Sequence, residues 1–254
     1  MGNLLEFLLH LYRFAKFCGT VLAGFFRRPV YLKETIEQFY QIGYRSLPIV
    51  TLTAVFTGMV VAFQTGTEMS RFGAKAYIGS VVAISLVREL GPVLTALVVA
   101  GRVGAGITAE LGSMQVTDQI NAMRAMATDP YKKLVLTRIA ALIVMLPMLV
   151  ALADTLGIIG GAFIASANLN VGVEMYKTTI VDALLVEDLI SGLIKPVVFA
   201  FIIGSIGCYL GINASGGTKG VGNSTTLSVV ISSVLIFMFD FIMTKIFFMF
   251  GRPV

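Results

Sequence analysis

The chain has 254 residues, of which 57% are hydrophobic and only 13% are charged. Soluble domains carry about 25% charged residues, so this composition excludes an ordinary soluble enzyme and indicates a membrane-embedded protein. In such a protein the net charge of +5 is typical of cytoplasmic loops and lipid headgroup contacts, not of nucleic-acid binding. One histidine and two distant cysteines leave almost no material for a metal site, a catalytic triad or a disulfide framework.

Residues 3–26 predict an amphipathic helix that lies in the membrane–water interface. Its polar residues recur at spacings of four, three and three, which places them on one side of a helix. These residues are Glu6, His10, Arg13 and Lys16. A secretory signal peptide is the alternative, and it is disfavoured because no basic segment comes first and no A-x-A site follows. The FRRP segment, residues 26–29, is expected to end the helix.

Five later segments are apolar and long enough to cross a bilayer, which takes roughly 20 residues of helix. They are residues 47–63, 77–101, 139–167, 193–212 and 227–250. The glycine-rich segment 213–226 separates the last two and is predicted to be a loop. Twelve Lys and Arg residues outside the spans fall on the side of the N-terminus and four on the other side. The N-terminus is therefore expected in the cytoplasm and the C-terminus outside.

Six ionisable residues fall inside the predicted spans, where each costs about 2.5–3.5 kcal/mol at a helix centre. Lys195 and Lys245 lie close enough to span ends to reach the headgroups. The deeper four are expected to face other helices or an aqueous cavity, and they are Arg88, Glu89, Asp154 and Asp240.

Arg88 and Glu89 are neighbours and point about 100° apart on a helix. They cannot form the usual pair four residues apart, so their partners must come from other helices or another subunit. Gly91 and Pro92 then interrupt the hydrogen-bond ladder, and the freed carbonyls are expected to accept from Arg88. The residues alone leave open whether this is a structural polar contact or part of a transport path.

Residues 110–130 predict a short amphipathic helix between the second and third spans. The residues of its apolar face are Val116, Ile120, Met123 and Ala127. The polar residues off this face are Asp118, Gln119 and Arg124. Such a helix either lies on the bilayer or docks into a groove of a partner protein, and methionines suit an adaptable docking face.

Sequence motifs for enzymatic chemistry are missing. The segment GGTKGVG has its glycines and lysine in the wrong arrangement for a P-loop, so the chain does not bind ATP in that way. One histidine excludes H-E-x-x-H, and no G-x-S-x-G occurs. Asp154 and Asp240 lack the context of an aspartyl dyad. The chain is predicted not to be an enzyme.

Residues 85–130 closely resemble the signature region of the MlaE-type permeases, also called YrbE-type, which are membrane subunits of MCE-associated ABC transporters. The matching motifs are R-E-L-G-P, then A-G-R-x-G-[SA]-x-[IL]-[TA]-A-E-[LI]-G, then a helix that ends in D-P. The segments 146–163, 193–201 and 239–248 are similar to later parts of these permeases. The resemblance covers roughly residues 30–250.

The resemblance implies an all-α membrane protein, with an interfacial helix and lead-in in residues 1–46 and a five-span permease domain in residues 47–254. It implies a homodimer in the bacterial inner membrane with two cytoplasmic ATPase subunits, which bind ATP and Mg. A hexameric MCE-domain protein in the periplasm and a STAS-domain protein are further implied partners. The implied substrate is phospholipid, moved between the inner and outer membranes to maintain outer-membrane lipid asymmetry. No cofactor or metal is implied for the chain itself.

The resemblance also implies roles for particular residues. The helix at about 114–127 becomes the coupling helix for the ATPase, with Glu110 at its approach. Arg88 and Glu89 lie near the lipid cavity, and Lys195 belongs to the same pattern. Residues expected beside the acyl chains are Leu90, Val93 and Leu97. Asp154 departs from the pattern and is expected to pair with Lys195 or Arg88.

Two other functions remain open from the residues. A secondary transporter would relay protons through Glu89, Asp154 and Asp240, although five spans fit poorly with the inverted repeats of such folds. A structural scaffold would only anchor a ring or an ATPase.

Overall fold

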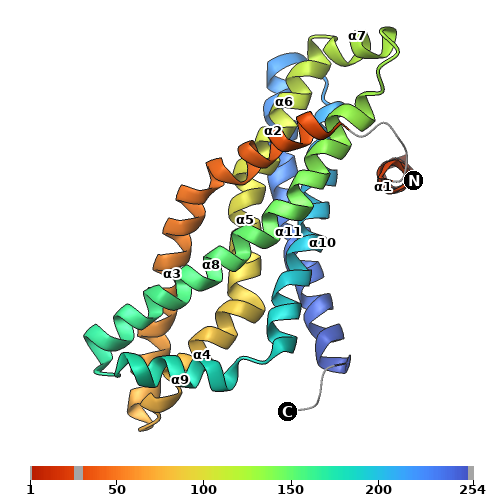
Figure 1. Cartoon of the computed structure of the whole chain (residues 1–254). Helices are drawn as coiled ribbons and strands as arrows, with labels where there is room; N and C mark the ends of the chain where they lie inside the picture. The colour runs from red at the N-terminus through yellow and green to blue at the C-terminus, as the bar shows by residue number, and fades with distance from the viewer. Residues whose placement is uncertain (1, 26–30, 251–254) are drawn as a thin grey trace. The chain divides into compact units, whose positions relative to one another are not determined.

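The computed structural model describes residues 2–25 and 31–250 (Figure 1). Every regular element within these ranges is a helix, which confirms the predicted all-α fold. The α-helices are α1 (Gly2–Gly24), α2 (Leu32–Ile42), α3 (Leu47–Arg71), α4 (Ile78–Ser85), α5 (Gly91–Val99), α6 (Ala105–Val116), α7 (Gln119–Ala125), α8 (Thr137–Leu169), α9 (Val173–Ala183), α10 (Val186–Ile212) and α11 (Gly217–Phe250). The wider π-helical turns are η3 (Leu86–Leu90), η4 (Ala100–Gly104) and η5 (Tyr131–Leu136), and the 3-10 turns are η1 (Tyr44–Ser46) and η2 (Lys75–Tyr77).

Five helical stretches of the described chain are long and apolar enough to cross a membrane, as predicted. They are Leu32–Arg71, Lys75–Val116, Tyr131–Leu169, Val186–Ile212 and Gly217–Met249. The predicted N-terminal helix is α1. The side chains of Glu6 and His10 and the segment 26–29 lie outside the described residues.

The predicted loop over residues 213–226 is wrong from Gly217 onward, where α11 begins. Gly216 and Gly217 have φ of +88° and +66°, which makes the turn into this helix. The hydroxyl groups of Thr225 and Thr226 donate to carbonyls four residues earlier. A membrane helix must satisfy its backbone internally, so helix is retained here in spite of the glycines.

The predicted helix over residues 114–127 is instead two helices. The amides of Thr117 and Asp118 donate to the carbonyls of Ser113 and Gln115 and end α6. Asp118 has a φ of +57°, a left-handed conformation that aspartate tolerates better than most residues. The chain therefore changes direction between α6 and α7.

The chain forms two compact units, each assembled from three separated parts of the sequence. Unit 1 contains residues 1–42, 100–142 and 201–233, and unit 2 contains residues 43–99, 143–200 and 234–254. In unit 1 the aromatic ring of Tyr209 packs against Phe14 and Phe17 of α1, with ring centroids 5.2 and 5.5 Å apart. These ring contacts attach α1 to unit 1.

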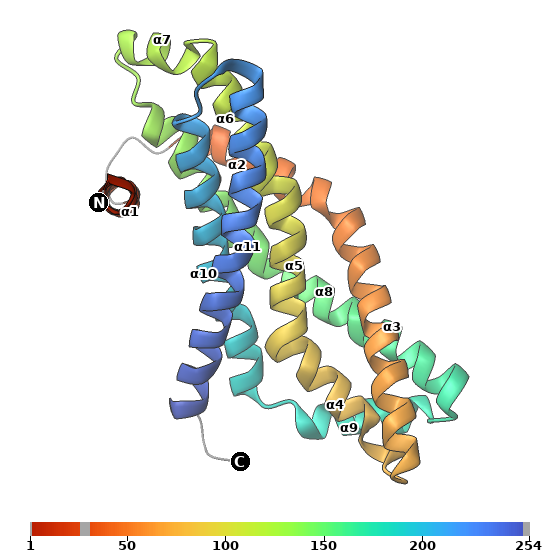
Figure 2. The ribbon, with the colours of Figure 1, turned by 180° about the vertical axis from the view of Figure 1, so that it is seen from behind.

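Unit 2 has an apolar core where α9 lies beside α4 (Figures 1 and 2). Its buried members are Ala62, Ile78, Val82, Leu86, Ala165, Leu169, Val171 and Tyr176. The tyrosine hydroxyl lies 3.5 Å from the carbonyl oxygen of Ile158. The core thus joins α3, α4, α8 and α9 through one aromatic side chain.

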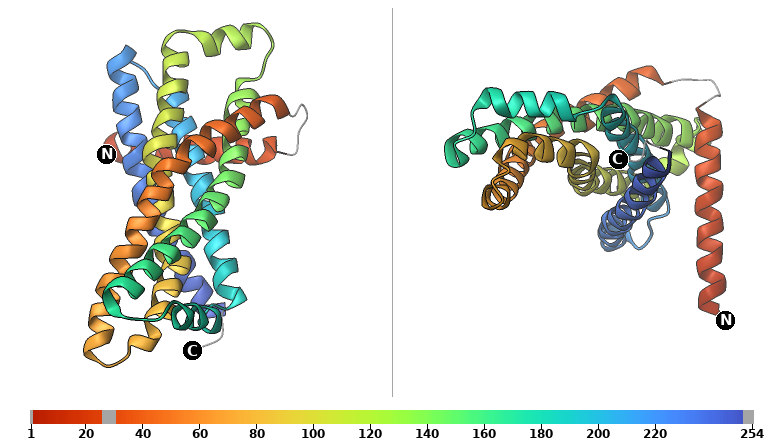
Figure 3. Two further views of the ribbon diagram at one scale, coloured as in Figure 1. Left: turned by 60° about the vertical axis from the view of Figure 1, so that its left-hand side comes forward. Right: turned by 90° about the horizontal axis from the view of Figure 1, so that it is seen from below.

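In unit 2, α3 and α8 approach each other through glycines (Figure 3). A Cβ at Gly58 of α3 would collide with the carbonyl group of Gly157 of α8, and a Cβ at Gly160 would lie 2.6 Å from the carbonyl oxygen of Val55. Small residues let membrane helices pack closely enough for extensive van der Waals contact.

Gly58→Ala is therefore expected to destabilise the protein by about 1–3 kcal/mol, because the added methyl group forces α3 and α8 apart. SDS-induced unfolding in mixed micelles measures the change. Gly222→Ala is the matched control, since a Cβ there has no atom within 4 Å. Equal effects of the two substitutions would contradict the close approach.

A second prediction concerns Tyr176, which lies in α9 between two spans. Burial raises the pKa of Tyr176 to about 12, above its ordinary value of about 10. The protonated phenol thus stabilises the fold, and stability falls as pH rises from about 10 through 12. Tyr176→Phe should reduce this fall, as measured by thermal unfolding at pH 8 and pH 11. Tyr77→Phe, which changes an exposed tyrosine, should leave the loss of stability between pH 8 and pH 11 unchanged. The same loss in Tyr176→Phe as in the unaltered chain would show that Tyr176 does not cause it.

Candidate functional site

Lys195 of α10 is the centre of a buried ionic cluster in unit 2. Only 1% of the residue is exposed. Its Nζ donates to Oε2 of Glu89 at 2.7 Å and to the hydroxyl of Thr244 at 2.8 Å. A third bond of 2.8 Å reaches the carbonyl oxygen of Arg88. An ammonium group has three donors, so these bonds use all of them.

The acidic members of this cluster come from two further helical segments. Asp240 of α11 forms an ion pair with Lys195, with 2.9 Å between Oδ1 and Nζ. The hydroxyl of Thr244, one turn along α11, donates to Oε1 of Glu89 at 2.9 Å. We call Glu89, Lys195, Asp240 and Thr244 the Lys195 cluster. It ties η3, α10 and α11 together through polar contacts.

Pro92 explains why the Arg88 carbonyl is open to Lys195. Proline has no backbone N–H and its ring clashes with the carbonyl four residues earlier, which here belongs to Arg88. The helix widens into the π-turn η3, and the amide of Gly91 donates to the carbonyl of Leu86. The freed Arg88 carbonyl accepts from Lys195, whereas the sequence predicted Arg88 itself as the donor to freed carbonyls.

The Arg88 side chain has a different partner, Asp188 of α10. Its Nε lies 2.5 Å from Oδ1 of Asp188. The other carboxylate oxygen accepts from the amide of Leu185 at 3.0 Å, which satisfies an unpaired donor at the start of α10. The two neighbouring charges of the sequence are therefore paired with different residues, both contributed by α10.

The Lys195 cluster holds two carboxylates and one ammonium, which gives a net charge of −1 with all three ionised. Glu89 is its more exposed carboxylate, with 38% of its side chain exposed against 17% for Asp240. The donors of the cluster are all used, and its carboxylate oxygens remain able to accept hydrogen bonds where hydrocarbon offers none. Among the described residues no group of three or more His, Cys, Asp or Glu residues is arranged to hold a metal ion.

Asp154 does not pair with Lys195 or Arg88, so that expectation is wrong. The donors of Lys195 are used by other residues of unit 2, as is the Nε of Arg88. Asp154 is 9% exposed, and its carboxylate lies against Gly91, where a Cβ would collide with it. Asp154 thus packs against the backbone beside the π-turn, outside the Lys195 cluster.

The residues expected beside acyl chains line the same segment of unit 2. Val93 is buried, and Leu90 and Leu97 are half-buried. Leu90 packs against the apolar core around Tyr176. Contact of these residues with lipid stays a prediction.

The residues expected at the ATPase lie in unit 1 and differ in accessibility. Ile120 is fully buried and Met123 is half-buried, whereas Met126 is 70% exposed. The remaining predicted residues are Glu110, Asp118, Gln119 and Arg124, which are exposed, and Val116, which is half-buried. Glu110 forms an ion pair with buried Arg138, with 2.7 Å between Oε1 and Nη2. The buried face of α7 anchors it to unit 1 and leaves most of its other residues exposed.

Sequence reasoning missed Asp188, Thr244 and Arg138. Thr244 was detectable, because it follows Asp240 by four residues and shares its helix face. Asp188 lies outside the five predicted spans, where ionisable residues are common. Arg138 directly precedes the third predicted span, which begins at residue 139, and is buried.

Comparison of the sequence with known proteins shows the family of the chain. The family described as Permease MlaE matches residues 35–246. The chain belongs to the MlaE permease family. A probable ABC transporter permease protein of Rickettsia typhi is 44% identical over 92% of this chain and 91% of its own length. Another from Synechocystis is 39% identical over 91% of this chain and 88% of its own length.

A plant relative extends the comparison. The chloroplast protein TRIGALACTOSYLDIACYLGLYCEROL 1 of Arabidopsis thaliana is 37% identical over 91% of this chain and 66% of its own length. Membership of the MlaE family makes this chain a multi-pass membrane protein and the permease subunit of an ABC transporter. A permease of this kind works with an ATPase partner.

Lys195→Met is expected to destabilise the MlaE-family chain by about 3 kcal/mol, because removing one partner leaves buried carboxylates unpaired. This is the low end of the usual range, since Glu89 is partly exposed. The free energy of unfolding in SDS mixed micelles measures it. Lys245→Met, which changes an exposed lysine of α11, should have little effect. The triple variant, Lys195→Met with Glu89→Gln and Asp240→Asn, should recover part of the lost stability, because no buried carboxylate is then left unpaired. No recovery would show that unpaired charge is not the cause of the destabilisation.

Proposed function

We propose that this permease moves phospholipids between the inner and outer membranes and so maintains outer-membrane lipid asymmetry. It acts as a homodimer in the bacterial inner membrane, with its N-terminus in the cytoplasm and its C-terminus in the periplasm. Two ATPase subunits bind ATP and Mg, a periplasmic MCE ring receives or supplies lipid, and a STAS-domain protein accompanies the ATPase. The helix α1 lies in the interface.

A lipid substrate is supported by one relative and by the family. The name of the Arabidopsis relative contains trigalactosyldiacylglycerol, a glycerolipid. Membership of an ABC permease family supports ATP as the energy source, in preference to proton relay through Glu89, Asp154 and Asp240. In keeping with this, Asp154 is not connected to the other two carboxylates.

The Lys195 cluster is the observation that carries the proposal. A phospholipid has a polar headgroup that needs hydrogen-bond partners on its way through a membrane protein. Glu89 offers carboxylate acceptors that are partly accessible, and Lys195 and Thr244 hold its carboxylate in place. Polar groups of this kind inside a span mark a substrate path more often than a lipid-facing surface.

The exposed side of α7 is the proposed contact with the ATPase. Gln119 and Arg124 of α7 are exposed, as is Met126, the residue that follows the helix. Because Ile120 is fully buried, an aspartate at that position would damage folding, so it is a poor test of docking. Met126 offers a clean test, since its side chain contributes little to the packing of unit 1.

Purification of the tagged chain from its native membrane, with mass spectrometry of proteins and lipids, tests the proposal. We expect a P-loop ATPase, an MCE protein and bound phospholipid. Met126→Asp should lower ATPase recovery at least severalfold and leave the MCE protein in place. Val181→Asp is the control, because it changes an exposed apolar residue on the next inter-span segment, on the opposite side of the membrane by span count. A chain recovered without ATPase or phospholipid would overturn the proposal.

A further inference from the structure

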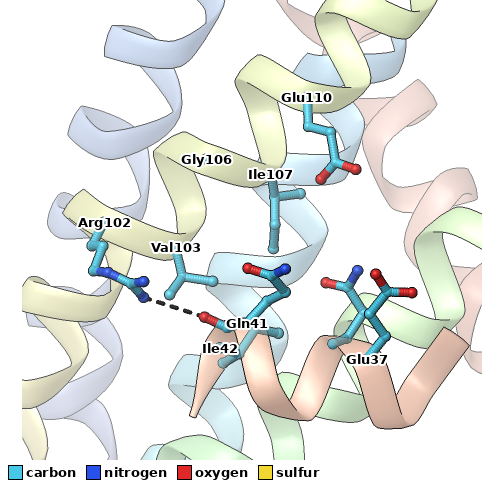
Figure 4. Close-up of a pocket in the computed structure, with 9 residues that line it drawn as sticks. Glu37, Gln41, Ile42, Arg102, Val103, Gly106, Ile107 and Glu110 are labelled. Carbon is cyan, nitrogen blue, oxygen red and sulfur yellow. Dashed lines mark hydrogen bonds between the residues drawn. The ribbon is translucent and has the colours of Figure 1, made fainter. Parts of the chain in front are cut away.

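A pocket in unit 1 shares no residue with the Lys195 cluster. It has a volume of about 390 Å³ and is formed by α2, η4 and α6. The side chains of Glu37 and Gln41 rise from α2, and Glu110 points toward them from α6 (Figure 4). Apolar lining is provided by Ile42, Val103 and Ile107. The pocket thus combines an apolar side with a polar rim.

The two ends of the pocket differ in charge. Arg102 lies at one end, where its Nη1 donates to the carbonyl oxygen of Gln41 at 3.4 Å. Glu37 is one helical turn from Gln41, about 6 Å along α2, and Glu110 faces the same end (Figure 4). Glu110 contacts Arg138 through Oε1 and is still largely exposed. A cation therefore suits one end, and an anion suits the guanidinium at the other.

The sequence of α2 places this pocket at the level of lipid headgroups. The side chains of Leu32, Ile36 and Tyr40 recur every four residues and are exposed, so they form one apolar face. The pocket-lining residues Glu37 and Gln41 belong to the rest of the helix. A short helix with one apolar face, charged residues elsewhere and a tyrosine lies in the interface.

We propose that the pocket binds the headgroup of a zwitterionic phospholipid with a primary ammonium, its ammonium at Glu37 and Glu110 and its phosphate at Arg102. Three N–H donors of the ammonium match the carboxylate oxygens and the side-chain amide of Gln41. A quaternary ammonium has no such donors. A glycerol headgroup brings a negative phosphate and no cation to balance Glu37. This inference deepens the proposed function by naming a headgroup class, and its role in transport rests on that function.

Titration of the purified, delipidated full-length chain with lipid, read by native mass spectrometry, tests the pocket. The probes are dioleoyl phosphatidylethanolamine and dioleoyl phosphatidylglycerol, which have the same acyl chains. We expect the ethanolamine lipid to bind about fivefold more tightly, as for one partly exposed ion pair. Glu37→Gln should reduce the preference, because only Glu110 is then left to hold the ammonium, and Arg102→Gln should weaken both lipids alike.

Glu34→Gln is the matched control. It removes the same charge from the same helix at a position outside the pocket. There Oε1 of Glu34 lies 3.8 Å from Nζ of Lys133. The preference should survive this substitution. Equal binding of the two lipids to the unaltered chain, or a preference that is undiminished in Glu37→Gln, would overturn the proposal.

The source of the headgroup is tested by competition. Glycerophosphoethanolamine, the soluble headgroup, should displace the lipid only at far higher concentration, because it lacks acyl chains. Equal potency would assign the pocket to a soluble ligand and overturn the lipid assignment. Binding is measured without ATP or partners, so a failure of lipid binding at the pocket leaves the transport proposal intact. If the pocket binds lipid but no lipid co-purifies from the native membrane, the transport proposal fails and the pocket assignment stands.

Discussion

The ammonium group of Lys195 is the contact on which the polar structure of unit 2 depends. It holds Glu89, Thr244 and Asp240 together and caps the carbonyl that Pro92 leaves without an amide donor. Each of these groups would be costly alone in an apolar environment. One buried cation therefore stabilises four polar groups at once, among them the carbonyl that a proline in the middle of a span leaves without its amide donor.

The same helix, α10, supplies the partner for the other charge. Asp188 binds Arg88 and also the amide of Leu185 at the start of α10. The adjacent charges Arg88 and Glu89 thus fix two positions of α10, one near its first turn and one two turns later. These contacts explain the R-E-L-G-P motif. Its two charges pair with α10, and its proline leaves the Arg88 carbonyl free to accept from Lys195 of the same helix.

Much of the fold was predictable because hydrophobicity and helix length dominate in membranes. The five spans, α1 and the membrane placement of Arg88 and Glu89 follow from composition and spacing alone. Contacts between residues about 100 positions apart, such as Arg88 with Asp188 and Lys195 with Glu89, depend on packing that no local pattern encodes. The start of α11 at Gly217 and the turn at Asp118 were missed for a related reason. Glycine content and periodicity predicted a loop and one continuous helix there, whereas the need of a membrane helix to satisfy its own backbone and a single left-handed residue decided the structure.

The charge of the Lys195 cluster has an electrical consequence. With its three side chains ionised the cluster carries one net negative charge, and moving one charge through a potential of 100 mV takes about 2.3 kcal/mol. A transport step that carried the cluster across part of the membrane field would therefore be driven or opposed by the membrane voltage. If the cluster stays still and only the lipid moves, no net charge crosses the field when the lipid is a zwitterion, because its own charges cancel. Such a step would not depend on the membrane voltage.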